Sequence, residues 1–440
     1  MTVASSVRTP YNEPAAWIAP RLWQGAILSL TLLPVGMAIA HRSSPVFLAV
    51  AALFCAAATC AERGVATLLG SMLRAARSPI GVAVLAALAW CILSLLWSGA
   101  PLLTIKVLGQ FWLSVLAGFV LFLTLPPHLG RNAYLGIAFG IIAASVIILT
   151  DLSSGLAVRQ AIGVRSASFI HNRPALTLLM GVVPLLALAT LRPGAVNRMV
   201  VGLAALGVLG VVAISESGAA RLGALVAFAV VVIARTSQRA SAGMLAFALA
   251  SAILLAPLTG PIAVALIPAR LHQALAASNS QARVDIWQSF GAAVAAEPWL
   301  GAGFGTSARM GDLPVAQEVA PERRELLGAS HAHNAALQIW VELGLPGAPM
   351  ALAIALLVIR HAVQGGGIMP ACSLRIIFST TSWFSPARAR SNFTNDRSPR
   401  FRSSLWQLMQ YVGTIFARSG AAAAGAAAAA AGAGAAAAAL

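Results

Sequence analysis

One long polar stretch, residues 281–347, interrupts a sequence that is otherwise mostly apolar. Three features in it are of types that could do chemistry: Arg283 on a predicted helix, a glycine-rich segment G-A-G-F-G at 301–305, and the pair His331 and His333. Arginine is a permanent cation that binds anions. Glycine-rich turns can hold phosphate, and paired histidines either ligate a metal or lie buried as structural residues. The stretch is therefore the first candidate for a functional site.

The neighbouring residues argue against a metal and against a phosphate loop. Two histidines two residues apart would need acidic or sulfur ligands at defined spacing, and the nearest upstream acids, Asp312 and Glu318, do not provide it. The glycine-rich segment lacks the preceding strand and the spacing of phosphate loops, so we predict a tight turn. We expect no metal and no other cofactor.

A helix is predicted to carry Arg283. Ile286, Phe290 and Val294 recur every four residues and form one apolar stripe. Arg283 lies one turn before this stripe and borders it, and Pro298 ends the helix.

A second helix is predicted directly after His333. Asn334, Gln338 and Glu342 repeat every four residues and form one polar stripe, and residues 344–347 carry the Gly and Pro that interrupt the helix. A helix from 334 to 363 is roughly 45 Å long, against a hydrocarbon core of about 30 Å. Its first part is therefore expected at or above the membrane surface, close to His333.

Two further polar sites lie outside this stretch. Arg221, in S-E-S-G-A-A-R at 215–221, stands at the mouth of an apolar helix and either serves a function or extends to lipid headgroups. The connection 151–173 either faces a polar ligand or is simply solvated. Its polar residues of interest are Arg159, Arg165, His171 and Asn172.

The composition is that of a membrane protein. Of the 440 residues 59% are hydrophobic and only 9% are charged, whereas a soluble domain has about 25% charged residues. The net charge of +17 does not indicate nucleic-acid binding, because the arginines are dispersed over many loops instead of clustered on one face. The four cysteines form neither a disulfide framework nor a metal set.

We predict an all-α polytopic membrane protein with about ten transmembrane helices and one large periplasmic loop that carries short helices. The predicted spans are 22–40, 45–61, 79–97, 107–125, 134–150, 174–191, 199–214, 222–234, 242–258 and 346–363. Residues 1–259 form the scaffold, 260–333 the periplasmic catalytic loop, and 334–363 an interfacial helix and the last span. Residues 364–440 end in an alanine-rich low-complexity run and are predicted to be disordered or artefactual. Residues 64–77 form either an amphipathic interfacial helix or a loop.

The arginines predict the orientation. With a cytoplasmic N-terminus, the cytoplasmic connections carry Arg8, Arg21, Arg63, Arg74, Arg77, Arg131, Arg192, Arg198, Arg235, Arg239 and Arg360. The opposite short loops carry fewer cations, among them Arg42, Lys106, Arg159 and Arg165. This bias follows the positive-inside rule and places the 260–333 loop outside the cytoplasm.

Four motifs in order resemble the bacterial O-antigen ligase and polymerase superfamily. They are S-x-S-x-x-x-R at 215–221, R-x-x-I-W at 283–287, P-x-x-G-x-G-x-G at 298–305 and H-x-H-N-x-x-L-x-x-W-x-E-x-G-x-x-G at 331–347. The resemblance covers roughly residues 22–363. It implies an inner-membrane enzyme with one large periplasmic loop, in which a loop histidine and periplasmic arginines are essential. By position these are His333, Arg221 and Arg283.

The resemblance also implies the reaction. The donor is a glycan on undecaprenyl pyrophosphate, whose phosphates suit arginine because its planar fork binds phosphate oxygens. A neutral His333 takes the proton of the acceptor hydroxyl on the lipid A core or on another glycan. We expect His331, Asn334, Arg165 and Lys106 to contact substrate, and membrane lipids to surround the protein. The pyrophosphate linkage stores the energy, so neither nucleotide nor metal is required.

Other functions remain open. A polymerase that joins lipid-linked O-antigen or exopolysaccharide repeat units shares the donor chemistry, and the sequence separates it poorly from a ligase. A transporter is disfavoured because no predicted span carries a clear ionisable residue at its midpoint. A purely structural membrane protein would not need histidines and arginines on one face.

Overall fold

The computed structural model describes residues 13–125, 131–191, 194–268, 270, 280–329 and 331–364, and in these ranges the chain contains helices and no strand. The predicted all-α polytopic class is confirmed. Of the tail predicted at 364–440 only Gln364 is described, and the remainder lies outside the described residues.

Ten long apolar helices and several short ones make up this part of the chain. The long ones are α1 (Glu13–Ile39), α2 (Ser44–Arg63), α4 (Pro79–Leu93), α5 (Pro101–Thr124), α6 (Arg131–Ser153), α8 (Asn172–Leu191), α9 (Ala195–Ile214), α10 (Gly218–Thr236), α11 (Gln238–Leu254) and α17 (Ala335–Gln364). The other helices, which are shorter or less apolar, are α3 (Val65–Ala76), η1 (Ser94–Leu96), α7 (Ala157–Ile162), η2 (Ser168–His171), η3 (Ala256–Leu258), α12 (Thr259–Leu266), α14 (Ser280–Ala296), η5 (Thr306–Asp312), α15 (Val315–Glu318), α16 (Pro321–Arg324) and η6 (Glu325–Gly328).

Seven of the described helices are long and apolar enough to cross a membrane: α1, α2, α4 with η1, α5, α6, α9 and α17. The pair α11 and α12 is bent by 65° and makes an eighth if it is counted as one span. The spans predicted at 174–191 and 222–234 are the helices α8 and α10, but these are not among the seven. The count of ten spans therefore stays a prediction.

Local sequence explains where several helices begin. Ser78, Ser217 and Ser237 each precede a helix and accept a hydrogen bond from a backbone N–H of its first turn, which satisfies a donor that has no partner within the helix. Gly64, with φ 79°, turns the chain between α2 and α3. The segment predicted as an amphipathic helix or a loop is the helix α3, and it buries none of its residues.

The outer surface of the bundle is apolar. Many large hydrophobic side chains on the long helices are mostly exposed, among them Leu53, Leu102, Leu206 and Phe247. A monomeric protein in water does not expose apolar area on this scale. These side chains are placed to face lipid.

Three buried clusters hold the helices together. One joins α1, α2 and α5, a second joins α6, α8, α9 and α10, and the third joins α11, α14 and α17 with the short helices of the large loop. Glycine permits close approach between α1 and α6. A Cβ at Gly136 would lie 2.8 Å from Thr31 Oγ1, and one at Gly140 would overlap the Thr31 carbonyl oxygen.

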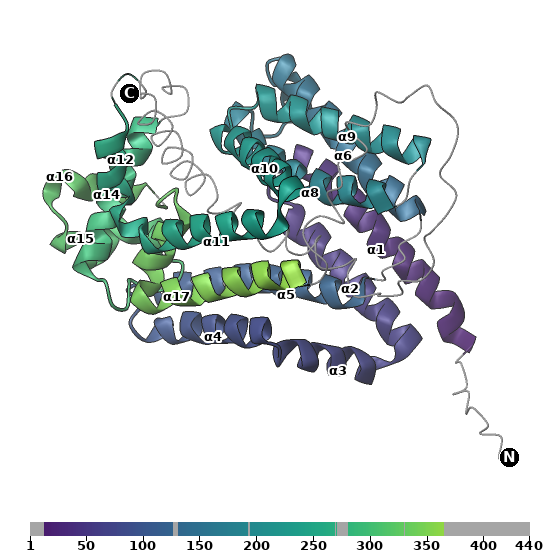
Figure 1. Cartoon of the computed structure of the whole chain (residues 1–440), viewed down its shortest axis with the longest axis horizontal. Coiled ribbons are helices and arrows are strands. Elements are labelled where there is room, and N and C mark those ends of the chain that lie inside the picture. The colour runs from purple at the N-terminus through teal and green to yellow at the C-terminus, as the bar shows by residue number, and fades with distance from the viewer. Residues whose placement is uncertain are drawn as a thin grey trace.

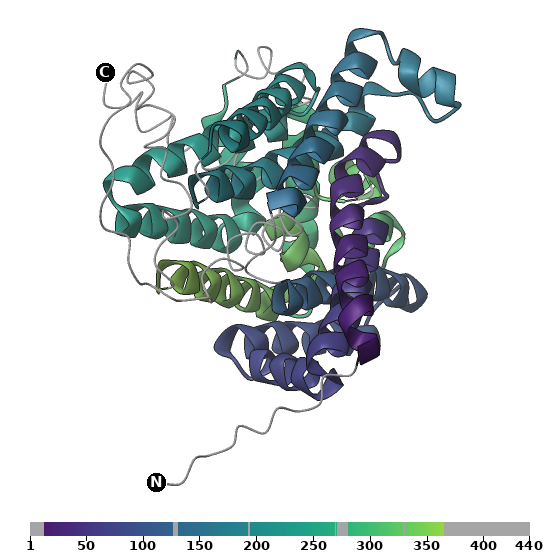
Figure 2. The same cartoon turned by 90° about the vertical axis from the view of Figure 1, so that its right-hand side faces the viewer.

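Helix α17 lies between α11 on one side and α4 on the other (Figures 1 and 2). The helices α12, α14, α15 and α16 of the large loop gather beyond one end of these three helices (Figure 1). The large loop is thus a packed unit with its own core, as the third cluster shows.

Connections that are far apart in sequence meet at this end, which we call the loop end. Ser168 Oγ donates to Glu216 Oε1 at 2.6 Å, so the α6–α8 connection touches the α9–α10 connection. The backbone N–H of Phe304 donates to Ser94 Oγ at 3.0 Å, so the large loop touches the end of α4. These contacts agree with the predicted alternation of helix direction, which places both connections on the side of the large loop.

Candidate active site

Helix α14 carries Arg283 at the edge of its buried face. Ile286, Phe290 and Val294 are buried, as the periodicity predicted, and Arg283 is half-buried beside them. Burial lowers the pKa of the Arg283 guanidinium. A cation that has lost part of its hydration is stabilised by an anionic ligand, so this position suits the binding of a phosphate.

The two histidines lie side by side directly before α17. Their ring centroids are 4.0 Å apart, with the ring planes at 41°. His333 has a φ of 48°, in the left-handed region that residues other than glycine rarely adopt. Such strain is kept where the surrounding structure requires it, often at functional sites.

Both imidazoles are held in the neutral form near pH 7. Burial, His331 and Arg283 lower the pKa of His333 to about 4. Burial and Arg173 lower the pKa of His331. A neutral imidazole has a lone pair that can accept a proton, and a lowered pKa keeps it available at physiological pH. The charge of Arg283 therefore acts on His333 in the folded chain.

Asn334 has a structural role in this geometry. It is 3% exposed, its Oδ1 accepts a hydrogen bond from the backbone N–H of Leu337 at 3.2 Å, and its Nδ2 lies 3.5 Å from Thr259 Oγ1. It therefore caps α17 and joins the end of the large loop to its beginning. Its contact with substrate stays a prediction.

The glycine-rich segment is a turn, as predicted, and it packs on α17. Gly301, Gly303 and Gly305 have φ values of 67°, 102° and 77°. A Cβ at Gly301 would lie 2.7 Å from the backbone of Glu342, and backbone hydrogen bonds of 2.8 and 2.9 Å join the turn to α17. Only glycine meets both the conformational and the steric requirement here.

Glu342 holds this turn from the inside of the protein. It is 4% exposed and accepts hydrogen bonds from Ser307 Oγ at 2.6 Å, from the backbone N–H of Gly305 at 2.7 Å and from Gln338 Nε2 at 2.8 Å. Just beyond it, α17 is interrupted at Gly344, which has φ 63°. The polar stripe seen in the sequence is thus an internal anchor between the turn and the kink of α17.

The charge of Arg173 acts on this candidate site, although the sequence did not single this residue out. It is exposed in the first turn of α8 and lowers the pKa values of both His331 and His41. The sequence did contain a signal, because Arg173 stands at the mouth of an apolar helix as Arg221 does. Only in the folded chain is the Arg173 charge close enough to His331 to lower its pKa.

Arg221 lies in the first turn of α10 and is exposed. Its Nη2 donates to the carbonyl of Ser215 at 2.5 Å, which holds the guanidinium against the end of α9. Next to it, a Cβ at Gly223 would lie 3.8–4.0 Å from Leu179 and Leu176 of α8. The beginnings of α8 and α10 are therefore neighbours, and Arg221 is at the same end of the bundle as Arg173.

The remaining predicted residues lie further along the same end. Arg165 is exposed in the α6–α8 connection, with its guanidinium 5.5 Å from the ring centre of Phe169. Lys106 is exposed in the second turn of α5, next to Val107, which packs against the glycine-rich turn. Their substrate contacts stay predictions. Within the described residues, no three side chains of His, Cys, Asp or Glu are grouped so that they could hold a metal ion.

The fold and the site together define a class, namely a polytopic membrane protein with a neutral histidine and Arg283 on one large folded loop and further arginines in the first turns of α8 and α10. Residues 202–352 match the family model described as O-Antigen ligase. The match runs from α9 into α17 and includes Arg221, Arg283, the glycine-rich turn and both histidines. No curated protein and no solved structure matched the chain.

The chain therefore carries an O-antigen ligase domain, and the resemblance inferred from the four motifs is confirmed. The family match implies an enzyme that transfers glycosyl groups, and the long apolar helices together with this match indicate a multi-pass membrane protein.

Proposed function

We propose that the protein is an O-antigen ligase that moves a polysaccharide from undecaprenyl pyrophosphate to a sugar of the lipid A core, at the periplasmic face of the bacterial inner membrane. The observation that carries this proposal is the pairing of a neutral His333 with a half-buried Arg283 inside the segment that matches the family. One residue accepts protons at pH 7, and the other binds phosphate.

In the proposed reaction an acceptor hydroxyl attacks the anomeric carbon of the donor glycan. His333 accepts the hydroxyl proton at its unprotonated ring nitrogen while the new C–O bond forms. The bond from the anomeric carbon to the pyrophosphate oxygen breaks, and undecaprenyl pyrophosphate leaves with the electron pair. Arg283 and Arg221 stabilise the negative charge of this leaving group, each such hydrogen bond contributing about 1.5–3 kcal/mol.

Variants separate these roles. His333→Ala is expected to insert and to bind carrier-linked glycan while transferring about 10²–10⁴-fold more slowly, as is typical for loss of a general base. Arg221→Lys and Arg283→Lys are expected to bind the donor less well, because lysine cannot make the bidentate contact. His331→Ala should be the milder of the two histidine changes. Transfer by purified His333→Ala at the wild-type rate would exclude His333 as the base.

A deletion strain tests the ligase assignment. Loss of a ligase leaves long polymer on the lipid carrier, which is measured by analysis of lipid-linked glycans alongside a lipopolysaccharide gel. Accumulation of single repeat units would instead identify the polymerase of the same superfamily. Because the pyrophosphate linkage supplies the energy, purified protein is expected to transfer glycan in the presence of EDTA.

A further inference from the structure

Helix α17 is broken at Gly344, and two backbone groups next to the break are paired with other segments. The N–H of Leu345 donates to the carbonyl of Pro298 at 2.9 Å, and the carbonyl of Leu343 accepts the indole N–H of Trp90 of α4 at 3.0 Å. Irregular backbone at membrane depth is stable only where its polar groups have partners. The break is therefore supported by the large loop and by α4.

The chain that follows α14 lies directly on this break. A Cβ at Gly344 would overlap the carbonyl of Trp299 and would lie 2.7 Å from the carbonyl carbon of Leu300. A Cβ at Gly301 would in turn lie 2.7 Å from the backbone nitrogen of Gly344. Trp299 and Leu300 are thus fixed at the same height in the membrane as Gly344.

The uncharged part of α17 indicates this height. No charged residue lies between Glu342 and Arg360, and residues 343–359 extend about 25 Å as helix, close to the hydrocarbon core of about 30 Å. Glu342 is buried in the protein, and Arg360 is exposed at the far end of the run. The break at Gly344 therefore lies near the boundary between acyl chains and headgroups on the side of the loop end.

Helix α4 indicates the same height independently. Residues 79–97 carry no charge and follow Arg77, so this run also matches the hydrocarbon core and ends at Trp97. Trp90, near the end of α4, contacts Leu343 at the beginning of the run in α17, so these two neighbouring helices run in opposite directions (Figure 1). The rings of Trp90 and Trp97 have their centroids 5.3 Å apart. Tryptophan is enriched at membrane–water boundaries, which agrees with this placement.

Three apolar side chains around the break are exposed. Trp299 is 67% exposed, Leu345 43% and Leu300 39%. We call Trp299, Leu300 and Leu345 the kink patch. Leu345 belongs to a helix that is long and apolar enough to cross the membrane, so the patch continues the lipid-facing surface of the bundle. An indole suits the membrane boundary, because its ring is apolar and its N–H can hydrogen-bond to water or headgroups.

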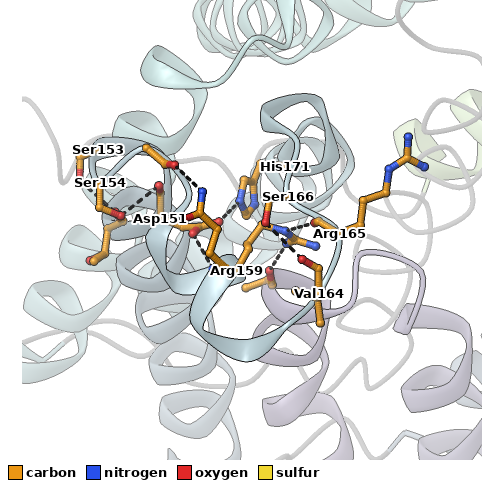
Figure 3. A network of polar contacts seen from close by, with 12 residues as sticks. Asp151, Ser153, Ser154, Arg159, Val164, Arg165, Ser166 and His171 are labelled. Carbon is orange, nitrogen blue, oxygen red and sulfur yellow. Dashed lines mark hydrogen bonds and ion pairs between the residues drawn. The ribbon is translucent and has the colours of Figure 1, made fainter.

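The α6–α8 connection, also at the loop end, is built differently. Asp151 Oδ2 lies 2.6 Å from His171 Nε2, and the other carboxylate oxygen accepts the backbone N–H of Arg159 at 3.0 Å (Figure 3). The sequence had left open whether Arg159 and His171 face a polar ligand, and the structure instead buries both. The exposed Phe169 of this connection has the Arg165 guanidinium 5.5 Å from its ring centre. Residues 298–308, by contrast, carry no charged side chain.

We propose that the kink patch inserts into the lipid bilayer at the boundary between headgroups and acyl chains, and so anchors the folded large loop to the membrane. The partner is the lipid surface on the side of the loop end. Insertion removes exposed apolar side chains from water, which is favourable. Because the glycine-rich turn packs on the same part of α17, the anchor fixes the height of the large loop. Lipid insertion of this patch does not depend on the proposed reaction.

Depth-dependent quenching in proteoliposomes tests the proposal. The full chain, in a cysteine-free background, carries a single NBD-labelled cysteine at Leu300, which leaves Trp299 in place. Phosphatidylcholine brominated near the headgroup quenches shallow probes, phosphatidylcholine brominated near the chain end quenches deep probes, and iodide quenches probes in water. We expect Leu300→Cys to lose most fluorescence to the shallow bromines and little to iodide.

Two matched controls calibrate the depth. Ala353→Cys is exposed near the middle of the run 343–359 and should lose most fluorescence to the deep bromines. Glu322→Cys is exposed on α16 of the same large loop and should lose most to iodide. Iodide quenching at Leu300→Cys as strong as at Glu322→Cys, with no quenching by either lipid, would overturn the proposal. Protection from lipid and iodide alike would also overturn it and assign the patch to a protein partner or a second copy.

A second test needs no label. A carboxylate is costly at the membrane boundary, whereas a side chain that faces water tolerates it. Trp299→Asp should therefore melt at a lower temperature in proteoliposomes than Trp299→Phe, and equal melting temperatures would overturn the anchor. Neither test measures glycan transfer, so failure of the anchor is distinguishable from failure of the proposed function.

Discussion

The depressed pKa of His333 predicts an unusual pH dependence of transfer. With a pKa of about 4, about 90% of His333 is neutral at pH 5, whereas an imidazole at its ordinary pKa of about 6.5 would be about 3% neutral. The value of kcat/KM reports the free enzyme and falls as the base becomes protonated. We therefore expect activity to be nearly unchanged from pH 7 to pH 5 and to fall to half near pH 4.

The residues around His333 predict how this profile moves. Burial is the main cause of the low pKa, and His331 and Arg283 add to it. Arg283→Gln removes a neighbouring cation, so protonation of His333 becomes easier. The acidic limb of the kcat/KM profile, where activity falls to half as the pH is lowered, should therefore shift up toward pH 6.5. Arg283→Lys keeps the cation and should leave the limb in place while weakening donor binding.

The assay measures kcat/KM in proteoliposomes from pH 3.5 to 8, with tryptophan fluorescence recorded at each pH to show that the fold persists. A wild-type acidic limb near pH 6.5 would refute the reasoning, because it would mean that His333 is not held in a buried cationic environment. A limb that stays in place in Arg283→Gln would show that Arg283 does not act on the base.

Three further predictions concern the scaffold of the site. Gly301→Ala introduces a Cβ 2.7 Å from the α17 backbone at a φ of 67°. This variant should lower the melting temperature in detergent, because the strain lowers the free energy of unfolding by about 1–3 kcal/mol. In the control Gly328→Ala the added Cβ meets nothing within 4 Å, so the melting temperature should stay unchanged. Glu342→Ala removes the acceptor of four hydrogen bonds. Each buried donor left unsatisfied costs about 1–3 kcal/mol of stability, so both the melting temperature and the transfer rate should fall. A wild-type melting curve for this variant would refute the role of Glu342 as an anchor. In a cysteine-free background, a cysteine at exposed Glu322 should react with a membrane-impermeant reagent in spheroplasts and one at exposed Arg239 should not; labelling at Arg239 would reverse the orientation.

Much of the fold was predictable because its causes are local. Long apolar runs predict helices in lipid, and the serine caps and glycine–proline breaks act on their immediate neighbours. The buried face of α14 followed from a four-residue period, and the interruption of α17 from Gly344 and Pro346. The number of spans did not follow, because α8, α10 and the bent pair of α11 and α12 differ little in composition from helices that do pass the length and hydropathy test.

The site was predictable only in part. The order of the motifs identified the segment that holds Arg221, Arg283 and His333, and the family match bears out that resemblance. Periodicity could indicate that Arg283 borders an apolar stripe. The sequence also predicted an Asn cap for the helix after His333, which the hydrogen bond from Leu337 to Asn334 confirms. It could not decide whether Asn334 also contacts substrate, since one amide can serve a backbone or a ligand equally well.

By itself, then, the sequence determined an all-helical membrane protein and the segment that matches the family model, because hydropathy and motif order are properties of the linear chain. The tertiary structure decided which charges act together. Arg173 and His331 are about 160 residues apart along the chain, and the Arg173 charge lowers the pKa of His331 only once the chain is folded. The neutrality of His333 likewise depends on burial and on cations from other helices, and both exist only once the chain is folded.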